Sequence, residues 1–314
     1  MNSANEPCVS IVIPVYNRRS LLGEAISSAL EQSFENIEVV VVDNASTDGT
    51  WDVCQEYASS DGRVRIFRNE ENIGPVRNWR RCLELARGTY GKILFSDDTV
   101  DRSFVEKAVP FLDDPEVGFV FTSAHIGSDR VNGETAYRFP GQTGKFSASR
   151  FIEEILRGGD APYSPGCALF RLQDLRENLL SHIPSPTISD FESHGAGPDV
   201  LLFLLTAARY RKFAYIDEPL AFFRAHGGSL SLSEQRRHLL RCYRQAKIWF
   251  AEQYADQKTI RSVCAREWKR ECREEGRWRS PRVVLGQYME KPPQLSLLGL
   301  TRFFRKGHVA NGNQ

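Results

Sequence analysis

The sequence predicts an α/β fold built on a doubly wound, mostly parallel sheet. Strand-length apolar runs alternate with helical patterns over the first 120 or so residues. The first two runs, at residues 9–15 and 37–42, are β-branched at most positions, which is typical of parallel strands buried on both faces. Polar and acidic residues follow the runs directly. Because open α/β sheets bind ligands outside the carboxyl ends of their strands, we expect the functional site at that edge.

The first two strands are predicted by their valine and isoleucine content. Residues 9–15 form the first run, which Pro14 interrupts near its end. After a polar turn, apolar residues at helical spacing predict a helix up to residue 30. A second run at residues 37–42 ends at Asp43, and the polar loop after it leads into a helix that we expect to reach residue 58.

The next apolar run ends in two adjacent carboxylates. A short third strand at 64–67 and a helix at 76–86 precede it. The run then begins at Gly91 and reaches Asp97 and Asp98 with no turn residue between. Two neighbouring like charges cost free energy unless a cation or hydrogen-bond donors compensate them. A solvated turn that caps the following helix would also explain an isolated pair, so the rest of the chain has to decide.

The middle of the chain is less regular. After a helix to residue 112 and a strand at 117–122, residues 125–144 are rich in glycine and polar residues and predict a hairpin or a mobile loop. The remaining expected elements are a helix at 147–156, a turn feeding a strand at 163–170, a loop at 183–198, a helix at 200–208 and short strands at 213–216 and 220–223.

The charge of the chain is unevenly distributed. Its 314 residues carry 41 Lys and Arg against 40 Asp and Glu, but residues 234–314 hold 18 basic and 8 acidic residues. That segment reads as helix with aromatic residues among the basic ones. Such a stretch indicates either contact with a membrane surface or a solvated helical face packed on the domain, and both readings stay open.

Cysteine usage and the amino terminus indicate the compartment. The seven cysteines form an odd set without a CxxC pair, which argues for reduced, mostly buried thiols and against a disulfide framework or a zinc site. Residues 1–7 lack the apolar core of a signal peptide, and no apolar run reaches the roughly 20 residues of a spanning helix. We expect a cytoplasmic protein, soluble or peripheral on the inner face of the plasma membrane.

Taken in order, several short motifs resemble the family 2 glycosyltransferases of GT-A fold. They are residues 10–18, Asp43 with residues 46–50, Asn72-x-Gly74 with Asn78, Ala86-x-Gly88-x-Tyr90, Phe95-Ser96-Asp97-Asp98 and Pro198-Asp199. Each motif alone is weak, but the ordered set over about residues 8–230 is specific. One departure is Ser96 in the first place of the usual aspartate-x-aspartate, so the acidic signal depends on Asp97 and Asp98.

The resemblance implies a domain organisation and an activity. A GT-A catalytic domain would span residues 1–233, with a nucleotide-binding half at 1–122 and an acceptor-binding half at 123–233, followed by a helical extension at 234–314. The implied enzyme is an inverting glycosyltransferase that moves a monosaccharide from a UDP- or dTDP-sugar to a saccharide or lipid-linked hydroxyl, in the assembly of a bacterial surface polysaccharide.

The resemblance also assigns nucleotide-binding roles. Asp43 would accept the ring N–H of uracil or thymine, because an acceptor-only group discriminates between bases. Pro14, Tyr16 and Arg18 would line the same pocket, and Asp97 would approach the ribose. Asn72 would also bind the donor, and Arg77 and Arg80 on the helix after it are candidate contacts of the diphosphate. An exposed basic helix face explains these two arginines equally well.

Three further residues carry the implied chemistry. Asp98 would bind the Mn²⁺ or Mg²⁺ ion that bridges the diphosphate, since hard cations prefer oxygen ligands. His226 would contact the metal or the diphosphate, although a lone histidine is often structural. Asp199 would be the general base that deprotonates the acceptor hydroxyl. Its place before an apolar helix also fits a helix N-cap.

Competing readings are weaker. A haloacid-dehalogenase-like phosphatase needs a second acidic residue two positions after its nucleophile and a later Thr or Val, a spacing that residues 97–101 do not fit. A nucleotidyltransferase of related fold needs a glycine-rich basic loop where this chain has residues 14–17. A catalytically inactive relative that binds sugar or nucleotide stays open. Nucleic-acid binding is least favoured, because the basic residues lie outside the expected cleft.

Overall fold

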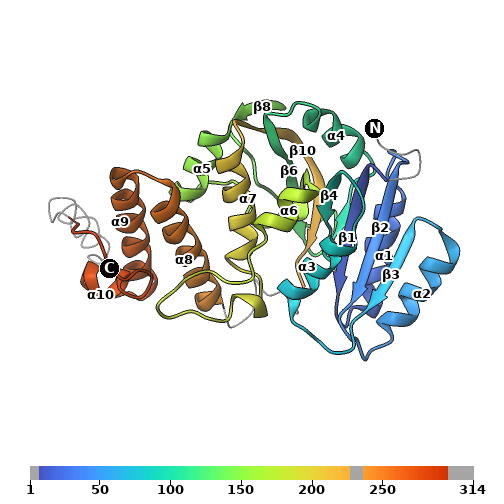
Figure 1. Cartoon of the computed structure of the whole chain (residues 1–314), viewed down its shortest axis with the longest axis horizontal. Helices are drawn as coiled ribbons and strands as arrows, with labels where there is room; N and C mark the ends of the chain where they lie inside the picture. Colours follow the sequence, from blue (N-terminus) through green and yellow to red (C-terminus); the bar gives the residue numbers. More distant parts are fainter. Residues whose placement is uncertain (1–6, 227–235, 296–314) are drawn as a thin grey trace, which may run out of the picture.

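A mixed sheet of ten strands lies at the centre of the structure, a computed structural model that describes residues 7–226 and 236–295 (Figure 1). Its strand order is β3-β2-β1-β4-β9-β6-β10-β5, with β7 paired to β6 and β8 to β10. The strands are β1 (Val9–Val15), β2 (Ile37–Asp43), β3 (Val64–Arg68), β4 (Tyr90–Ile93), β5 (Thr99–Val100), β6 (Val117–Gly127), β7 (Gly133–Ala136), β8 (Gly144–Ser147), β9 (Ala168–Arg171) and β10 (Lys212–Arg224).

Helices connect and cover these strands. They are α1 (Arg19–Leu30), α2 (Thr50–Ser60), α3 (Pro75–Leu85), α4 (Phe104–Leu112), α5 (Ala148–Arg157), α6 (Leu172–Asn178), α7 (Pro198–Arg209), α8 (Arg236–Tyr254), α9 (Gln257–Glu274) and α10 (Pro281–Leu285), with the 3-10 turns η1 (Pro165–Cys167) and η2 (Phe191–Ser193).

The first half of the sheet is parallel, as the sequence predicts. β1 pairs in parallel with β2 and with β4, and β2 pairs in parallel with β3. Every residue of β1 and β2 is buried. Val15 lies beside Asp43 in the register, so the chain segments that follow β1 and β2 leave the sheet at the same edge.

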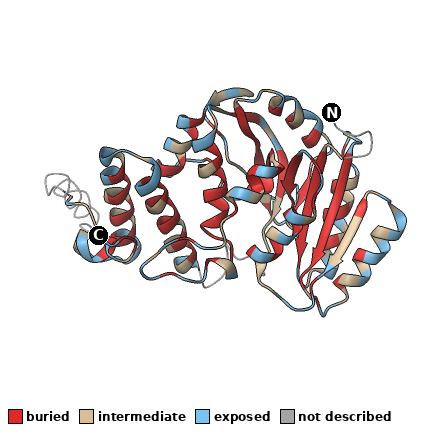
Figure 2. Ribbon diagram, viewed as in Figure 1, coloured by how far each residue is buried: buried red, intermediate tan, exposed pale blue. Residues whose placement is uncertain are grey.

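Alternation along the strands divides the interior into two cores. Val12, Val40 and Val42 face one core, together with residues of α3, α5 and α7. Ile11, Ile13, Val39 and Val41 face the other, together with residues of α1 and α4. Side chains on a strand point alternately to its two faces, so a strand that is apolar at every position requires helices on both sides. Figure 2 shows the buried strands between these partly exposed helices.

Two expectations about strands need correction. β4 ends at Ile93, so Asp97 and Asp98 lie in a turn beyond the strand rather than at its last residues. The two short strands expected at 213–216 and 220–223 are one strand, β10, whose register shifts around Pro219. A proline cannot donate to the sheet, which explains why the pattern looked interrupted. β9 runs antiparallel between β4 and β6 and makes the sheet mixed.

The described part of the C-terminal extension packs on the sheet domain. Residues of α8, α9 and α10 belong to the same apolar core as those of α7, and Figure 1 shows α8 beside α7 with α9 beyond it. A buried ion pair joins Lys247 Nζ to Glu267 Oε1 at 2.6 Å. All seven cysteines are free thiols and six are buried, as expected.

Two further points concern the extension. Within residues 7–226 and 236–295, no helix has the length and apolarity needed to cross a bilayer. The aromatic and basic residues that we noted at 297–306 lie outside the described residues.

Candidate active site

The loops after β1 and β2 hold each other in place. The Asn17 N–H donates to Ser46 Oγ at 2.8 Å, and the Thr47 N–H donates to Asn17 Oδ1 at 2.9 Å. Asn17 has a positive φ of 50°, a conformation that asparagine tolerates better than most residues. The Arg18 N–H donates to Thr50 Oγ1 at 2.9 Å. The start of α1 is therefore positioned by the loop that follows Asp43.

Asp43 is fully buried at the end of β2. Its Oδ1 accepts the Ser46 N–H at 3.1 Å. Its Oδ2 lies 3.1 Å from Arg68 Nε, but no donor among the described residues makes a well-aligned hydrogen bond to that oxygen. A buried acceptor whose hydrogen bonding is incomplete is costly, which makes Oδ2 a candidate to receive a donor from a ligand.

Asn72 belongs to a group of amides that fixes the next loop. Its Oδ1 accepts from Asn44 Nδ2 at 2.8 Å and from the Gly74 N–H at 2.9 Å. Asn69 Nδ2 donates to Asn44 Oδ1 at 2.7 Å and to Asn78 Oδ1 at 2.9 Å. These bonds hold the chain between β3 and α3 against the end of β2. Asn72 thus has a structural task in addition to any contact with a nucleotide.

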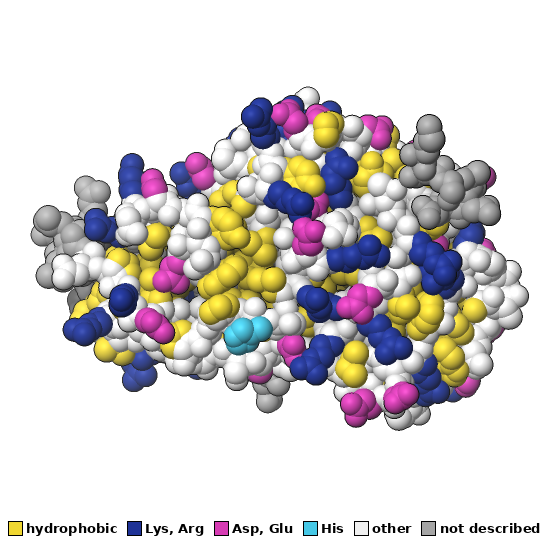
Figure 3. Space-filling view, in the orientation of Figure 1, with side chains coloured by type: hydrophobic (Ala, Val, Ile, Leu, Met, Phe, Trp, Pro, Cys, Tyr) yellow, Lys and Arg dark blue, Asp and Glu magenta, His cyan; other side chains and the backbone are white. Residues whose placement is uncertain are grey.

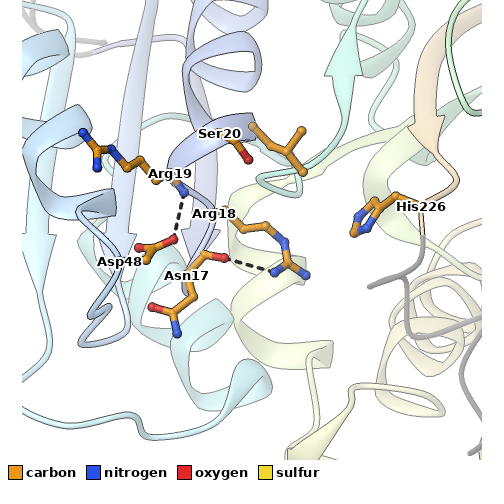
Figure 4. Close-up of a pocket in the computed structure, with 7 residues that line it drawn as sticks. Asn17, Arg18, Arg19, Ser20, Asp48 and His226 are labelled. Carbon is orange, nitrogen blue, oxygen red and sulfur yellow. Dashed lines mark hydrogen bonds between the residues drawn. The ribbon is translucent and has the colours of Figure 1, made fainter.

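An open pocket of about 530 Å³ lies between the β1 loop and the end of β10. Its lining consists of Asn17, Arg18, Arg19, Ser20, Leu21, Asp48 and His226. In Figure 4 the Arg18 side chain extends from the β1 loop toward His226. The pocket also lies at the amino end of α1, where backbone N–H groups and the helix dipole favour anions.

Two carboxylates and a histidine meet next to this pocket. His226 Nε2 lies 2.9 Å from Asp97 Oδ2, and Arg18 Nε lies 3.9 Å from the same oxygen. Asp98 is buried, and its Oδ1 accepts the Arg224 N–H at 3.0 Å. Burial, and then the charge of Asp97, raise the pKa of Asp98 well above its usual value. Keeping both carboxylates ionised therefore costs free energy, and a cation beside them would lower that cost.

A buried lysine partly compensates this charge. Lys92 on β4 is fully buried, and its Nζ donates to the Gly166 carbonyl at 2.5 Å. Burial lowers the pKa of Lys92 to about 8, while Cys167 and the charge of Asp98 act in the opposite direction. Residues 91–95 read as an apolar run in the sequence and this lysine was not singled out there, although a charged residue inside an apolar run is a visible signal.

Asp199 lies in the first turn of α7, with both carboxylate oxygens hydrogen-bonded. Oδ1 accepts the N–H of Gly197 at 2.9 Å and of Val200 at 2.7 Å, and Oδ2 accepts the Tyr243 hydroxyl at 2.7 Å. Gly197 precedes the helix with φ 102°, which favours glycine. Burial raises the pKa of Asp199 to about 7, although its three donors oppose the rise. The N-cap of α7 is Gly197 and Asp199 is the second residue of the helix, so the alternative reading of Asp199 as the N-cap is wrong. Its raised pKa suits a general base.

Tyr137 packs against β10 on the side of the Asp97-Asp98 turn. Its ring lies 6.0 Å from that of Phe223, centroid to centroid, and the N–H of the next residue, Arg224, donates to Asp98 Oδ1. Burial is the largest cause of the raised pKa of Tyr137, and Cys167, Asp199, Asp160 and Asp98 add to it. Nothing in the spacing of the sequence indicated Tyr137 or Tyr243, since both reach the site through tertiary contacts.

The remaining candidates lie at the margins. Pro14 is buried within β1, and Tyr16 is 43% exposed just beyond that strand. Arg77 pairs with Glu192 at 2.8 Å, and Arg80 Nη1 donates to the Leu179 carbonyl at 2.7 Å. Neither arginine lines the pocket. Both make contacts toward the acceptor half, and their diphosphate role stays a prediction.

Comparison with known proteins identifies relatives over the same region. The family model described as "Glycosyl transferase family 2" matches residues 10–179. "Putative teichuronic acid biosynthesis glycosyltransferase TuaG" of Bacillus subtilis is 37% identical over 117 residues, which are 37% of this chain and 46% of that protein. The glycosyltransferase GlyG of Streptococcus pneumoniae is 25% identical over 232 residues, 72% of this chain and 73% of that protein. The matched part is therefore less than half the length of TuaG.

The solved structures agree with the fold. S. aureus TarS 1-349 in complex with UDP-GlcNAc superposes with a TM-score of 0.62 at 16% identity, covering 92% of this chain and 99% of the other. At this identity the likeness concerns the fold, and it confirms the GT-A architecture that the motifs imply.

Proposed function

This chain belongs to glycosyl transferase family 2, and from that premise we propose that it transfers a monosaccharide from a UDP- or dTDP-sugar to a hydroxyl of a saccharide or lipid-linked acceptor, with inversion at the anomeric carbon. The observation that carries the proposal is the pair of acidic centres: Asp97-Asp98 beside His226 and Arg18, and Asp199 beside Tyr243. One centre adjoins a pocket lined by Arg18 and His226, and the other is a buried carboxylate with a pKa of about 7.

The donor nucleotide would occupy the edge formed by the β1 and β2 loops. Asp43 Oδ2 would accept the ring N–H of uracil or thymine. Pro14, Tyr16, Asn72 and Asp97 would line the nucleoside side. The diphosphate would face Arg18 and the amino end of α1. That TarS is solved with UDP-GlcNAc supports the uridine reading.

A divalent cation would be held at the turn after β4, where the buried Asp98 stands next to Asp97. Asp98 would supply a buried carboxylate, Asp97 a second oxygen and His226 an imidazole nitrogen. Mn²⁺ and Mg²⁺ prefer oxygen-rich sites of this kind. When bound, the cation neutralises negative charge on the departing diphosphate. Arg18, 3.9 Å from Asp97, would add positive charge on the same side.

Asp199 would act on the acceptor. Its Oδ2 would receive the proton of the acceptor hydroxyl. At the same time the acceptor oxygen would bond to the anomeric carbon, and the bond from this carbon to the nucleoside diphosphate would break. The two N–H groups on Oδ1 hold the carboxylate in place. A pKa of about 7 keeps a substantial fraction ionised near neutral pH and makes it a stronger base than an ordinary aspartate.

We infer a role in bacterial surface polysaccharide assembly from the relative TuaG, whose name refers to teichuronic acid biosynthesis. Lipid-linked acceptors lie at a membrane, and Trp278 and Val283, in the loop after α9 and in α10, are exposed. Basic and acidic side chains both appear at this end of the molecule in Figure 3. We propose that this end contacts anionic lipid on the inner face of the plasma membrane. Trp278→Ala should weaken binding to anionic vesicles, and unchanged binding would reject this part of the proposal.

Thermal unfolding with a panel of nucleotides tests the donor assignment. A ligand that binds only the native state raises the unfolding temperature by mass action. We expect UDP and UDP-sugars to raise it in the presence of Mn²⁺, dTDP less so, and GDP and ADP not at all. A purine nucleotide that stabilises the chain more than UDP would overturn the assignment.

A further inference from the structure

Four side chains with metal-binding atoms gather between the loop before α7 and the first turns of α8. They are Asp190, His194, His238 and Cys242, and one ligand atom from each lies within 4.8 Å of the others. This group is separate from Asp97, Asp98 and His226, which the proposed function uses.

The spacing of the four residues brings them together in pairs. Asp190 and His194 are four residues apart around η2, and His238 and Cys242 are four residues apart on α8. Residues at this separation on a helix share one face. The two pairs then meet because α8 packs beside α7 and the loop that precedes it.

The interatomic distances suit a tetrahedral ion. Cys242 Sγ lies 3.6 Å from His194 Nε2 and 3.7 Å from His238 Nε2. His238 Nε2 lies 2.9 Å from Asp190 Oδ2, and His194 Nε2 lies 4.0 Å from Asp190 Oδ1. Zinc–ligand bonds of about 2.0–2.3 Å at tetrahedral angles separate sulfur from nitrogen by about 3.6 Å and nitrogen from oxygen by about 3.3 Å. All four ligand atoms lie within 4.8 Å of one another, so changes of up to about 1.5 Å in these separations would complete the coordination.

Burial distinguishes this group from a catalytic one. Cys242 is fully buried and the His194 side chain is 3% exposed, so no substrate reaches the thiol as it would a nucleophile. The side chains of Asp190 and His238 are 51% and 34% exposed and leave an entry path for an ion. A thiol, two imidazoles and one carboxylate form a borderline-soft set, which favours zinc over manganese or magnesium.

We propose that Asp190, His194, His238 and Cys242 bind one zinc ion that ties the loop before Asp199 to helix α8. The ion would cross-link two segments that meet again at the active site, because Tyr243 follows Cys242 and donates to Asp199. Cys242 would bind as thiolate and release its proton to solvent. The site positions Asp199 and Tyr243 and takes no part in sugar transfer itself.

One hydrogen bond must change when the ion binds. The Ala196 N–H donates to His194 Nδ1 at 3.1 Å. Coordination through Nε2 places the ring proton on Nδ1, so this bond opens and the nearby peptide reorients. Ala196 lies three residues before Asp199, so metal binding would change the conformation of the loop that leads to the base.

The proposed zinc site differs from the expectation that cysteine spacing gave. The site has a single cysteine together with two histidines and a carboxylate, and such a set leaves no CxxC pattern in the sequence.

Metal analysis of the full purified chain tests the proposal. We expect about one zinc per chain in wild type after removal of loosely bound metal. The Co²⁺-substituted protein should show tetrahedral ligand-field bands and a thiolate-to-cobalt charge-transfer band. His238→Ala and Cys242→Ser should lose the metal and the charge-transfer band. His182→Ala, an exposed histidine outside the group, and Asp98→Ala should keep both.

The outcomes separate this site from the proposed function. Retained zinc in Asp98→Ala shows that the site is independent of the cation at Asp97-Asp98, whether or not transfer is ever detected. Wild-type protein that binds neither Zn²⁺ nor Co²⁺ more tightly than His238→Ala overturns the proposal. So does a wild-type Co²⁺ spectrum without a thiolate band, a result that needs no variant to fold.

Discussion

The hydroxyl of Tyr243 donates to Asp199 Oδ2 at 2.7 Å, so a residue of the C-terminal helix α8 contacts the candidate base at the start of α7. The two residues are 44 positions apart. Tyr243 is partly buried, and its pKa is raised well above the usual value by desolvation and by Asp199. The hydrogen bond stabilises the carboxylate form of Asp199 and limits the rise of its pKa.

Removing this hydroxyl should therefore alter the pH dependence of transfer. Tyr243→Phe takes away a donor to the ionised carboxylate, so the pKa of Asp199 should rise further above 7. We expect the acid limb of the kcat/KM profile to move to higher pH while the alkaline limb stays in place. Tyr163→Phe is the matched control, because its ring packs against Tyr243 with centroids 4.9 Å apart, whereas the hydroxyl that reaches Asp199 belongs to Tyr243. Identical profiles for wild type and Tyr243→Phe would contradict the contact's role.

Asp199→Asn should separate catalysis from binding. Loss of a general base lowers kcat by roughly 10²–10⁴-fold, whereas UDP affinity measured by calorimetry should stay unchanged, because the hydrogen bonds of Asp199 go to Gly197, Val200 and Tyr243 and not to the loops after β1 and β2. Asp52→Asn, at an exposed carboxylate on α2, should leave both quantities unaffected. Loss of UDP affinity with retained turnover would reject the assignment.

The same substitution has a predictable effect on stability. The folded pKa of Asp199 is raised from 3.8 to about 7, so the folded state binds this proton more tightly than the unfolded state. Its favourable contribution is complete below about pH 4 and is lost as pH rises through about 7. The amide of Asp199→Asn cannot ionise, and the variant should gain stability relative to wild type between about pH 5 and pH 8, by at most about 4 kcal/mol. Urea unfolding at pH 5 and pH 8 measures the difference in free energy of unfolding between the variant and wild type. A variant that is less stable relative to wild type at pH 8 than at pH 5 would contradict the prediction.

Lys92 should control metal affinity through Asp98. Lys92→Met removes a buried positive charge that favours the ionised form of Asp98, so the pKa of Asp98 should rise. Metal and proton then compete more strongly, and half-saturation by Mn²⁺ should need about tenfold more metal near neutral pH, with recovery at higher pH. Lys107→Met, at an exposed lysine paired with Glu218, is the control. Equal Mn²⁺ affinity in all three proteins would remove Lys92 from the account.

Asp43→Asn should weaken the binding of the donor nucleotide and leave the binding of inorganic diphosphate unchanged. The amide would direct a donor, instead of an acceptor, at the ring N–H, which costs roughly 1–3 kcal/mol or 5- to 150-fold in affinity for UDP. Binding of inorganic diphosphate, which lacks the base, should not change. An equal loss for both ligands would show that the substitution disturbs the loop rather than base recognition.

The parallel half of the fold was predictable because local patterns determine it. Valine and isoleucine at most positions of β1 and β2 require burial on two faces, and that requirement alone implies helices on both sides of the sheet. The order of the acidic residues then brings Asp43 and the Asp97-Asp98 turn to one edge. Pro219 misled the reading of β10, because one proline interrupts hydrogen bonding without ending the strand.

The contacts that shape the acceptor side were not predictable. Helical spacing in α8 shows which face is apolar, but not which element covers that face. In the sequence, nothing distinguishes Tyr243 from the other aromatic residues of α8. Only the packing of α8 on α7 brings it to the site. For the same reason, His238 and Cys242 are unremarkable without Asp190 and His194 from a loop about 45 residues earlier. The positive φ of Tyr137 was not predictable from the sequence either, because it depends on tertiary contacts.

Diffraction from crystals grown with UDP and Mn²⁺ tests the central claim most directly. The account predicts an anomalous peak that places manganese in contact with Asp98 and the UDP diphosphate, with His226 adjacent. The uracil ring N–H should donate to Asp43, and the Asp199 carboxylate should lie across the same cleft. Manganese or UDP bound elsewhere, with Asp43, Asp98 and Asp199 making no shared site, would contradict it.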